Sequence, residues 1–136
     1  MEFKTYVDCL SAETASAGLL LEGMKYVILN DELYPKDSVK AYRFEFSIAL
    51  AEACVAELVD VACTLKRRDE EQLDVGSKAK SASNKAALAL CAFEVAKEAL
   101  EKIPMENKEG EDLVTSIQIT IPALLSNIVD ISREFM

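Results

Sequence analysis

The residues with the clearest chemical potential in this 136-residue chain are carboxylates. Glu57 and Asp60 stand three positions apart in a segment with helical periodicity, so their side chains share one helix face, about 5–6 Å apart. Joined by an acid of a preceding helix, such as Glu22, they could hold Mg²⁺ or Mn²⁺ and position a water for attack on a phosphate. The competing interpretation is a solvated acidic face, which is the more common use of such a pair.

A short motif extends this metal hypothesis. The string Glu-Leu-Val-Asp-Val, residues 57–61, resembles the ExxD helix of the all-α nucleotide pyrophosphohydrolases. The resemblance covers five residues and implies that Glu57 and Asp60 correspond to a metal-binding pair in a dimeric, metal-dependent enzyme. That family also carries an ExxE motif on the preceding helix, whereas here the acids of that region are Glu13 and Glu22, nine positions apart.

Other catalytic chemistries lack their residues. The chain has no histidine, which removes Ser-His-Asp and Cys-His nucleophile systems and His-ligated zinc. It has neither a G-x-G-x-x-G nor a Walker-type loop to hold phosphate. The cysteines have no CxxC spacing and each falls inside a helical pattern, so we expect reduced thiols that pack as small apolar side chains. They are Cys9, Cys54, Cys63 and Cys91.

Charge and apolar content restrict the partners and the location. Fifteen Lys and Arg stand against 24 Asp and Glu, and the formal charge of −9 argues against binding nucleic acid through its phosphates. The first ten residues have no signal-peptide pattern. Apolar runs such as 17–21 are far shorter than the roughly 20 residues of a membrane span. We therefore expect a cytoplasmic protein with no membrane or nucleic-acid partner.

Helical periodicity predicts the elements that must position these side chains. Apolar residues recur every three or four positions in four segments, most regularly between 44 and 65, where no charge interrupts the stripe. The stripe there is Phe44, Ile48, Ala51, Val55, Leu58, Ala62 and Leu65. The expected inner residues of the other segments are Leu20, Leu21, Met24, Val27 and Ile28; Ala86, Leu90, Phe93, Ala96, Leu100 and Ile103; and Leu113, Ile117, Ile121, Leu124, Ile128, Ile131 and Phe135.

Turn signals separate these segments. Asp37 or Ser38 is a suitable N-cap for the second helix, and Asp112 for the fourth. A polar stretch, 68–77, leads into the third helix, which would begin near Ser77 or Ser83. Pro104 follows the end of that helix.

One stretch is ambiguous between helix and strand. Ile117, Ile119 and Ile121 alternate with polar residues, as in a strand, and Pro122 removes a helical hydrogen bond. A lone strand would have to pair across a dimer. We favour a helix over 113–121 that is kinked or restarted at Pro122, and keep the strand as the alternative.

The predicted fold is all-α, a single domain spanning 1–136, built as an antiparallel up-down-up-down four-helix bundle. Weak similarities at an offset of 69–72 residues also suggest two repeated helical hairpins. Such similarities are common between any two Ala- and Leu-rich amphipathic helices, so the repeat is one of two open interpretations.

Surplus apolar side chains give the leading functional hypothesis. The second and fourth helices carry apolar residues beyond their core stripe, and large exposed apolar surfaces usually mark interfaces. These residues are Phe46, Leu50, Cys54, Val61, Val114, Ile119, Leu125 and Val129. We expect a non-enzymatic protein that acts through protein–protein contact as a homo-oligomeric scaffold or adaptor, with no cofactor. The alternatives are the metal-dependent phosphohydrolase, and an acidic protein that occupies a basic nucleic-acid-binding site on a partner.

Overall fold

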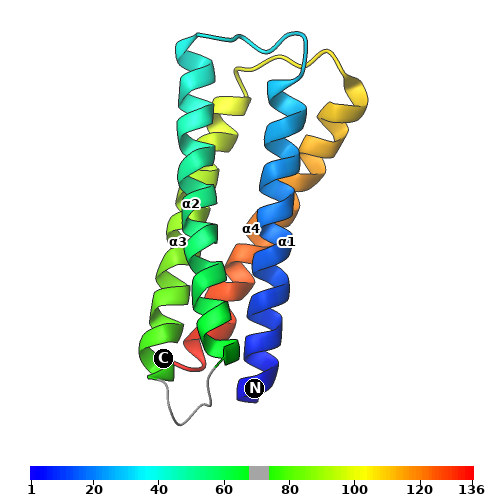
Figure 1. Ribbon diagram of the computed structural model, residues 1–136. Helices are drawn as coiled ribbons and strands as arrows, with labels where there is room; N and C mark the ends of the chain where they lie inside the picture. Colours follow the sequence, from blue (N-terminus) through cyan, green and yellow to red (C-terminus); the bar gives the residue numbers. More distant parts are fainter. Residues whose placement is uncertain (68–73) are drawn as a thin grey trace.

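The computed structural model describes residues 1–67 and 74–136. They form four helices, α1 (Phe3–Leu29), α2 (Val39–Arg67), α3 (Val75–Leu100) and α4 (Lys108–Arg133), and no strand occurs within these two ranges. Consecutive helices run in opposite directions, and both termini lie at the same end of the molecule (Figure 1). Each helix packs against two others, α1 against α2 and α4, and α3 against α2 and α4. The predicted all-α four-helix bundle is confirmed.

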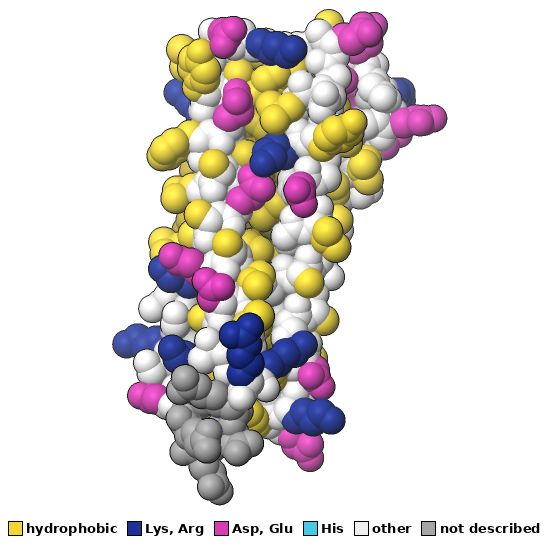
Figure 2. Space-filling model, in the orientation of Figure 1, with side chains coloured by type: hydrophobic (Ala, Val, Ile, Leu, Met, Phe, Trp, Pro, Cys, Tyr) yellow, Lys and Arg dark blue, Asp and Glu magenta, His cyan; other side chains and the backbone are white. Residues whose placement is uncertain are grey.

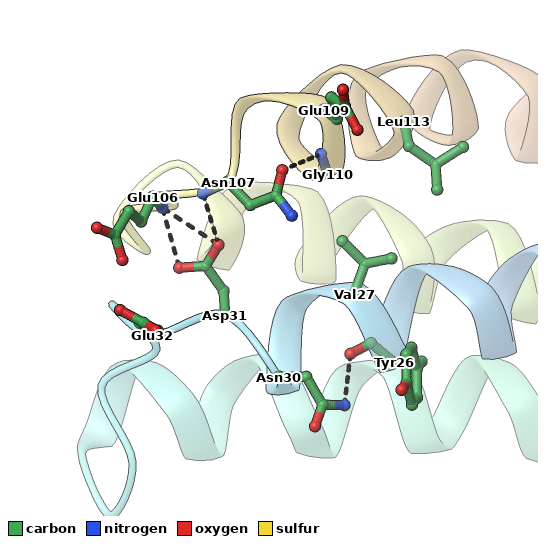
Figure 3. A pocket seen from close by; sticks show the side chains of 10 residues that line it. All are labelled: Tyr26, Val27, Asn30, Asp31, Glu32, Glu106, Asn107, Glu109, Gly110 and Leu113. Atoms are coloured by element: carbon green, nitrogen blue, oxygen red, sulfur yellow. Dashed lines mark hydrogen bonds between the residues drawn. The ribbon is translucent and has the colours of Figure 1, made fainter.

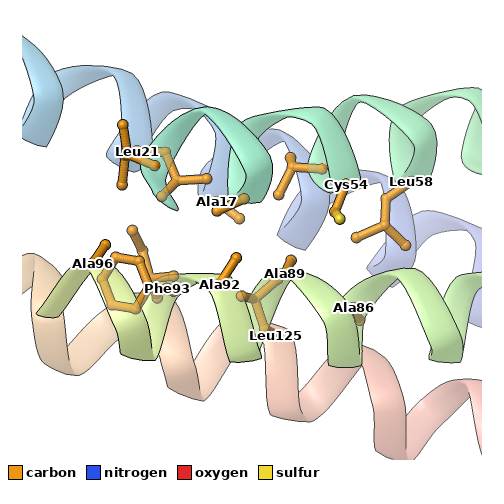
Figure 4. Packing of buried hydrophobic residues seen from close by; sticks show 14 of the residues in the cluster. Ala17, Leu21, Cys54, Leu58, Ala86, Ala89, Ala92, Phe93, Ala96 and Leu125 are labelled. Atoms are coloured by element: carbon orange, nitrogen blue, oxygen red, sulfur yellow. The ribbon is translucent and has the colours of Figure 1, made fainter. Parts of the chain in front are cut away.

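The core stripe of α2 lies where its heptad spacing predicts. All seven residues, from Phe44 to Leu65, are buried. Facing them, α3 buries a row of alanines, which lets α2 and α3 form the most extensive helix contact of the bundle. Figure 4 shows this seam, with Ala89, Ala92 and Ala96 of α3 on the side towards α2. Because alanine adds little side-chain volume, two helix backbones can approach closely there.

The inner faces of α1 and α4 match the prediction at most positions, such as Met24, Ile117 and Ile121, and differ from it at their edges. Leu20 and Val27 are half-buried, and Leu113 is exposed, while Val114 beside it is buried. The buried residues of α1 are Tyr6, Val7, Leu10, Thr14, Ala17, Leu21, Met24 and Ile28. Apolar residues stand side by side at 20–21, 27–28 and 113–114. The sequence alone is therefore compatible with either residue of each pair facing the core.

The helix starts are confirmed for α2 and corrected for α3 and α4. Ser38 caps α2, because its Oγ accepts a hydrogen bond from the Ala41 backbone N–H at 3.1 Å. α3 begins at Val75, and the side chain of Asp74 accepts from Ser77 N–H at 3.0 Å, so Ser77 is not its first residue. Ser83 likewise lies within α3. Most of the polar connection predicted over 68–77 lies outside the described residues.

The fourth helix begins earlier than predicted. The Asn107 side chain accepts from the Gly110 N–H at 3.1 Å, so Asn107 and not Asp112 is the N-cap. Gly110 is buried at the point where α4 approaches α1, and a Cβ at this position would lie 2.9 Å from Cγ1 of Val27. The close approach of the two helices therefore requires glycine here.

The stretch 113–121 is helical, and the strand alternative is wrong. Ile117, Ile121, Leu125 and Ile128 recur at helical spacing and are all buried, whereas Ile119 is 72% exposed. Pro122 lies inside α4, which continues to Arg133. Burying four large side chains outweighs the roughly 3 kcal/mol that a proline costs inside a helix.

Among the described residues, α4 alone is long and apolar enough to cross a membrane by length and composition. Core helices of bundles share this composition, and the inner side chains of α4 are buried within the bundle. The absence of a membrane partner and the cytoplasmic location therefore stay predictions from the sequence.

Candidate functional site

The two carboxylates singled out by the sequence are both exposed on α2. Glu57 points towards α3, where its Oε2 lies 2.6 Å from Nζ of Lys85. The hydrogen bond and the negative charge of Glu57 raise the pKa of Lys85. Asp60 has no ion-pair partner within the described part of the chain. Glu57 is thus already neutralised by a cation of the protein.

The expected acid of the first helix lies on the other side of α2. Glu22 lines a groove of about 350 Å³ between α1 and α2, together with Glu52 and Val59. The carboxylate of Glu52 is bound by Nζ of Lys25 at 3.0 and 3.2 Å. The two ion pairs place Glu52 towards α1 and Glu57 towards α3, on opposite edges of one helix.

The structure therefore does not assemble the carboxylate cluster that the metal hypothesis requires. Over residues 1–67 and 74–136, no three Cys, Asp or Glu side chains are grouped so that they could hold one ion. Glu13, the other glutamate of α1, bonds to Asn127 of α4, and burial raises the pKa of Glu13. Each acid considered for a shared site faces a different neighbour.

A second acidic region lies at the end of the bundle, where the α1–α2 and α3–α4 connections meet. It surrounds an open pocket of about 600 Å³ lined by Tyr26, Val27 and Leu113 as well as by carboxylates (Figure 3). Asp31 accepts backbone N–H bonds from Glu106 at 2.9 and 3.2 Å and from Asn107 at 3.1 Å.

The pKa values of two carboxyl groups in this end pocket are shifted in opposite directions. The backbone N–H groups of Glu106, Leu33 and Asn107 hold the pKa of Asp31 below its ordinary value. The Glu32 side chain raises the pKa of Glu106, because it favours a proton shared between the two carboxyl groups and carries a like charge when both are ionised. Asp31 thus joins two connections of the chain, a structural role that accounts for its buried charge.

A further feature is an apolar surface formed by α2 and α3. Five large side chains are exposed there: Val39, Phe46 and Leu50 of α2, with Leu88 and Val95 of α3. We call this surface the α2–α3 outer face. Val39 and Phe46 are each 73% exposed. In Figure 2, hydrophobic side chains stand along the left edge of the molecule, over α2 and α3.

The outer face differs from the rest of the molecule in charge. Helices α2 and α3 carry eight Lys and Arg against six Asp and Glu, whereas α1 and α4 carry four against seven. The acidity of the chain therefore lies on α1, on α4 and in the connections. A surface that is apolar and nearly neutral has a low desolvation cost on contact with another protein.

The sequence identified part of this surface. Phe46 and Leu50 were expected outside the core stripe, and both are exposed. The α3 residues Leu88 and Val95 were missed, although they lie seven positions apart and off the α3 core stripe. Cys54 is buried, and burial, followed by the charge of Glu57, raises its pKa, while Cys91 is exposed beside Leu88 and Val95.

Comparison with known proteins gave no significant match to a protein-family model, a curated protein or a solved structure. The function of this chain is therefore argued from its own surfaces.

Proposed function

We propose that the protein acts through protein–protein contact, as a homo-oligomeric scaffold or adaptor, and that the α2–α3 outer face is its contact surface. The observation that carries this proposal is the grouping of Val39, Phe46, Leu50, Leu88 and Val95 on one exposed two-helix layer. Scattered single apolar residues are ordinary on protein surfaces, but a contiguous group of large ones is the usual mark of an interface.

The size of the layer supports the proposal. α2 has 29 residues and α3 has 26. At about 1.5 Å per residue and 8–10 Å between axes, two such helices present a face of roughly 800 Å². A standard interface buries about 800 Å² on each partner. Phe46, in the first third of α2, is the kind of aromatic anchor that dominates binding energy in such contacts.

The test is the molar mass in solution, measured by light scattering from micromolar to tens of micromolar protein. We expect a dimer or larger assembly that Phe46→Glu converts to monomer. Ile119→Glu is the matched control, because Ile119 is 72% exposed but lies on α4, away from the outer face. It should leave the mass unchanged.

Two results would overturn the proposal. The first is a wild-type monomer throughout this concentration range. The second is an assembly that Ile119→Glu disrupts as strongly as Phe46→Glu does. Circular dichroism of both variants verifies that the helices remain folded, as expected for substitutions at exposed positions.

A further inference from the structure

The outward side of α2 carries a second regular stripe besides the core stripe. Its positions step by four and three residues alternately, the spacing of a coiled-coil seam. The stripe consists of Val39, Arg43, Phe46, Leu50, Ala53, Glu57, Asp60 and Thr64. The first seven are exposed and Thr64 is half-buried. A helix with two such seams can bury one in its own bundle and offer the other to a partner.

This outer seam is self-complementary when reversed. It has a basic residue towards one end, Arg43, apolar residues at its centre, and acids towards the other end, Glu57 and Asp60. Its steps read the same in both directions, about a midpoint between positions 51 and 52. Arg43 has no ion-pair partner among the described residues, nor has Asp60.

We propose that the partner is a second copy of this chain, with the two α2 helices antiparallel across a two-fold axis at that midpoint. This inference rests on the proposed function and specifies its partner and its register. The contacting layers are Leu50 with Ala53, Phe46 with Glu57, Arg43 with Asp60, and Val39 with Thr64 of the second copy. Each occurs twice, because an isologous interface repeats every contact.

The charged layers have partners of opposite sign. Arg43 of one copy meets Asp60 of the other, an ion pair formed twice. Glu57 is already neutralised by Lys85 at 2.6 Å, so the ring of Phe46 packs against an ion pair and not against an isolated negative charge. The Lys85 ammonium held there also suits the face of an aromatic ring.

Helix α3 gives an independent indication of the same axis. Glu57 pairs with Lys85, and Arg43 and Ala99 line the same pocket. The residue numbers of these two pairs add to the same total. The level of positions 51–52 on α2 therefore corresponds to about position 90–91 on α3.

Exposed α3 residues flank that level. Leu88 and Val95 lie on either side of it, with their midpoint about one residue beyond it, and the exposed Cys91 lies almost on it. The axis that α2 requires thus places Leu88 of one copy against Val95 of the other. It also brings the two Cys91 side chains next to each other. Both helices of the outer face are self-complementary about one axis.

The first experiment exchanges charges between copies, with dissociation constants from sedimentation equilibrium at low salt. Arg43→Glu alone places two acids opposite each other, and Asp60→Lys alone does the same with two bases. Each variant should bind itself at least about tenfold more weakly than wild type. An equimolar mixture of the two variants should recover the wild-type mass, because the acid introduced at position 43 then meets the base introduced at position 60. Both effects should diminish in 0.5 M salt.

The second experiment uses Cys91 as a reporter of the axis. Diamide takes two electrons and two protons from a pair of thiols and leaves a disulfide. Wild type at low micromolar concentration should give a covalent dimer on a non-reducing gel. Cys91→Ser should abolish it, Cys63→Ser should retain it, and Phe46→Glu should reduce it to the level of random collision.

The outcomes separate the register from the proposed function. A wild-type monomer overturns both. An assembly that Phe46→Glu dissociates, but that shows neither recovery in the charge-exchanged mixture nor a Cys91 cross-link, overturns the two-fold register and leaves the contact surface standing. Recovery together with the cross-link supports both.

Discussion

The two halves of the bundle are joined in different ways. α2 and α3 meet along a seam of small residues, such as Ala86 and Ala89, and present an apolar, nearly neutral outer face. α1 and α4 are joined by polar contacts at their ends. Tyr6 Oη lies 2.8 Å from Oγ of Ser132 at one end, and Asp31 accepts from Glu106 and Asn107 at the other.

This difference suggests a division of roles. Buried polar bonds are directional and fix the register of α1 against α4, while close apolar packing makes the α2–α3 layer rigid. A rigid layer loses little conformational freedom when it binds, which favours recognition. Under the proposed function, the net negative charge of α1 and α4 disfavours association of copies through that side.

The largest expected effect breaks the α2–α3 seam. Ala89 is fully buried, so Ala89→Leu should lower the free energy of unfolding by about 2–3 kcal/mol through overpacking. The matched control is Ala87→Leu, at an exposed position of the same helix, which should change it by less than about 0.5 kcal/mol. Urea unfolding followed by circular dichroism measures both. Equal effects would show that the seam is not tightly packed.

The next effect tests the polar bond that joins α1 to α4. Tyr6 and Ser132 are fully buried, and the Tyr6 ring stacks on Phe135 with centroids 4.5 Å apart. Ser132→Ala leaves the Tyr6 hydroxyl without a partner and should cost about 1–2 kcal/mol. Adding Tyr6→Phe removes the unpaired group, so the double variant should cost less than the sum of the single ones. Strict additivity in urea unfolding would contradict the coupling.

The core stripe of α2 could be predicted fully because its sequence offers one solution. No charge occurs between Phe44 and Leu65 on that stripe, and every alternative rotation would bury a charged side chain. α1 offers two solutions, since Leu20 beside Leu21 and Val27 beside Ile28 fit either rotation. In the structure α1 has the rotation that also buries Tyr6, whose hydrogen-bond partner Ser132 lies 126 positions away in the sequence.

The candidate sites were less predictable for a similar reason. Glu57 and Asp60 share a helix face as expected, but the pairing of Glu57 with Lys85 depends on how α3 packs against α2. Asp31 follows the end of a helix. No neighbouring residue in the sequence indicates that its carboxylate accepts hydrogen bonds from the backbone N–H groups of residues 106 and 107. The role of each carboxylate depends on a partner that is distant in the sequence. Local residue spacing gives no information about which partner that is.

Two glycines sharpen the description of α1 and α4. Gly110→Ala should destabilise by about 1 kcal/mol, because the new Cβ would lie 2.9 Å from the branched side chain of Val27. Gly23 lies within α1 with open space around it, so Gly23→Ala should stabilise by about 0.5–1 kcal/mol. Thermal unfolding compares the two. A stabilising Gly110→Ala would show that α4 does not approach α1 this closely.

The smallest effect is a pH dependence located at the end pocket. The pKa of Asp31 is lowered from 3.8, so its stabilising contribution is present above pH 3.8 and is lost as pH falls through the folded-state value. The pKa of Glu106 is raised from 4.5 by Glu32, so its contribution is present below pH 4.5 and is lost as pH rises through the folded-state value. Both contributions coexist only in mild acid.

Two isosteric variants separate these contributions in thermal unfolding from pH 3 to 7. Asp31→Asn keeps an acceptor for the backbone N–H groups and should remove part of the acid-side loss of stability. Glu106→Gln should remove part of the decline above pH 4.5, because the repulsion between Glu32 and Glu106 is then absent. Since the backbone N–H groups of Glu106 and Asn107 hold Asp31, the charge on Glu106 is not needed for that junction, and the two effects should add. If one variant alone removed both the loss of stability in acid and the decline above pH 4.5, the carboxyl groups of the end pocket would titrate as one coupled unit.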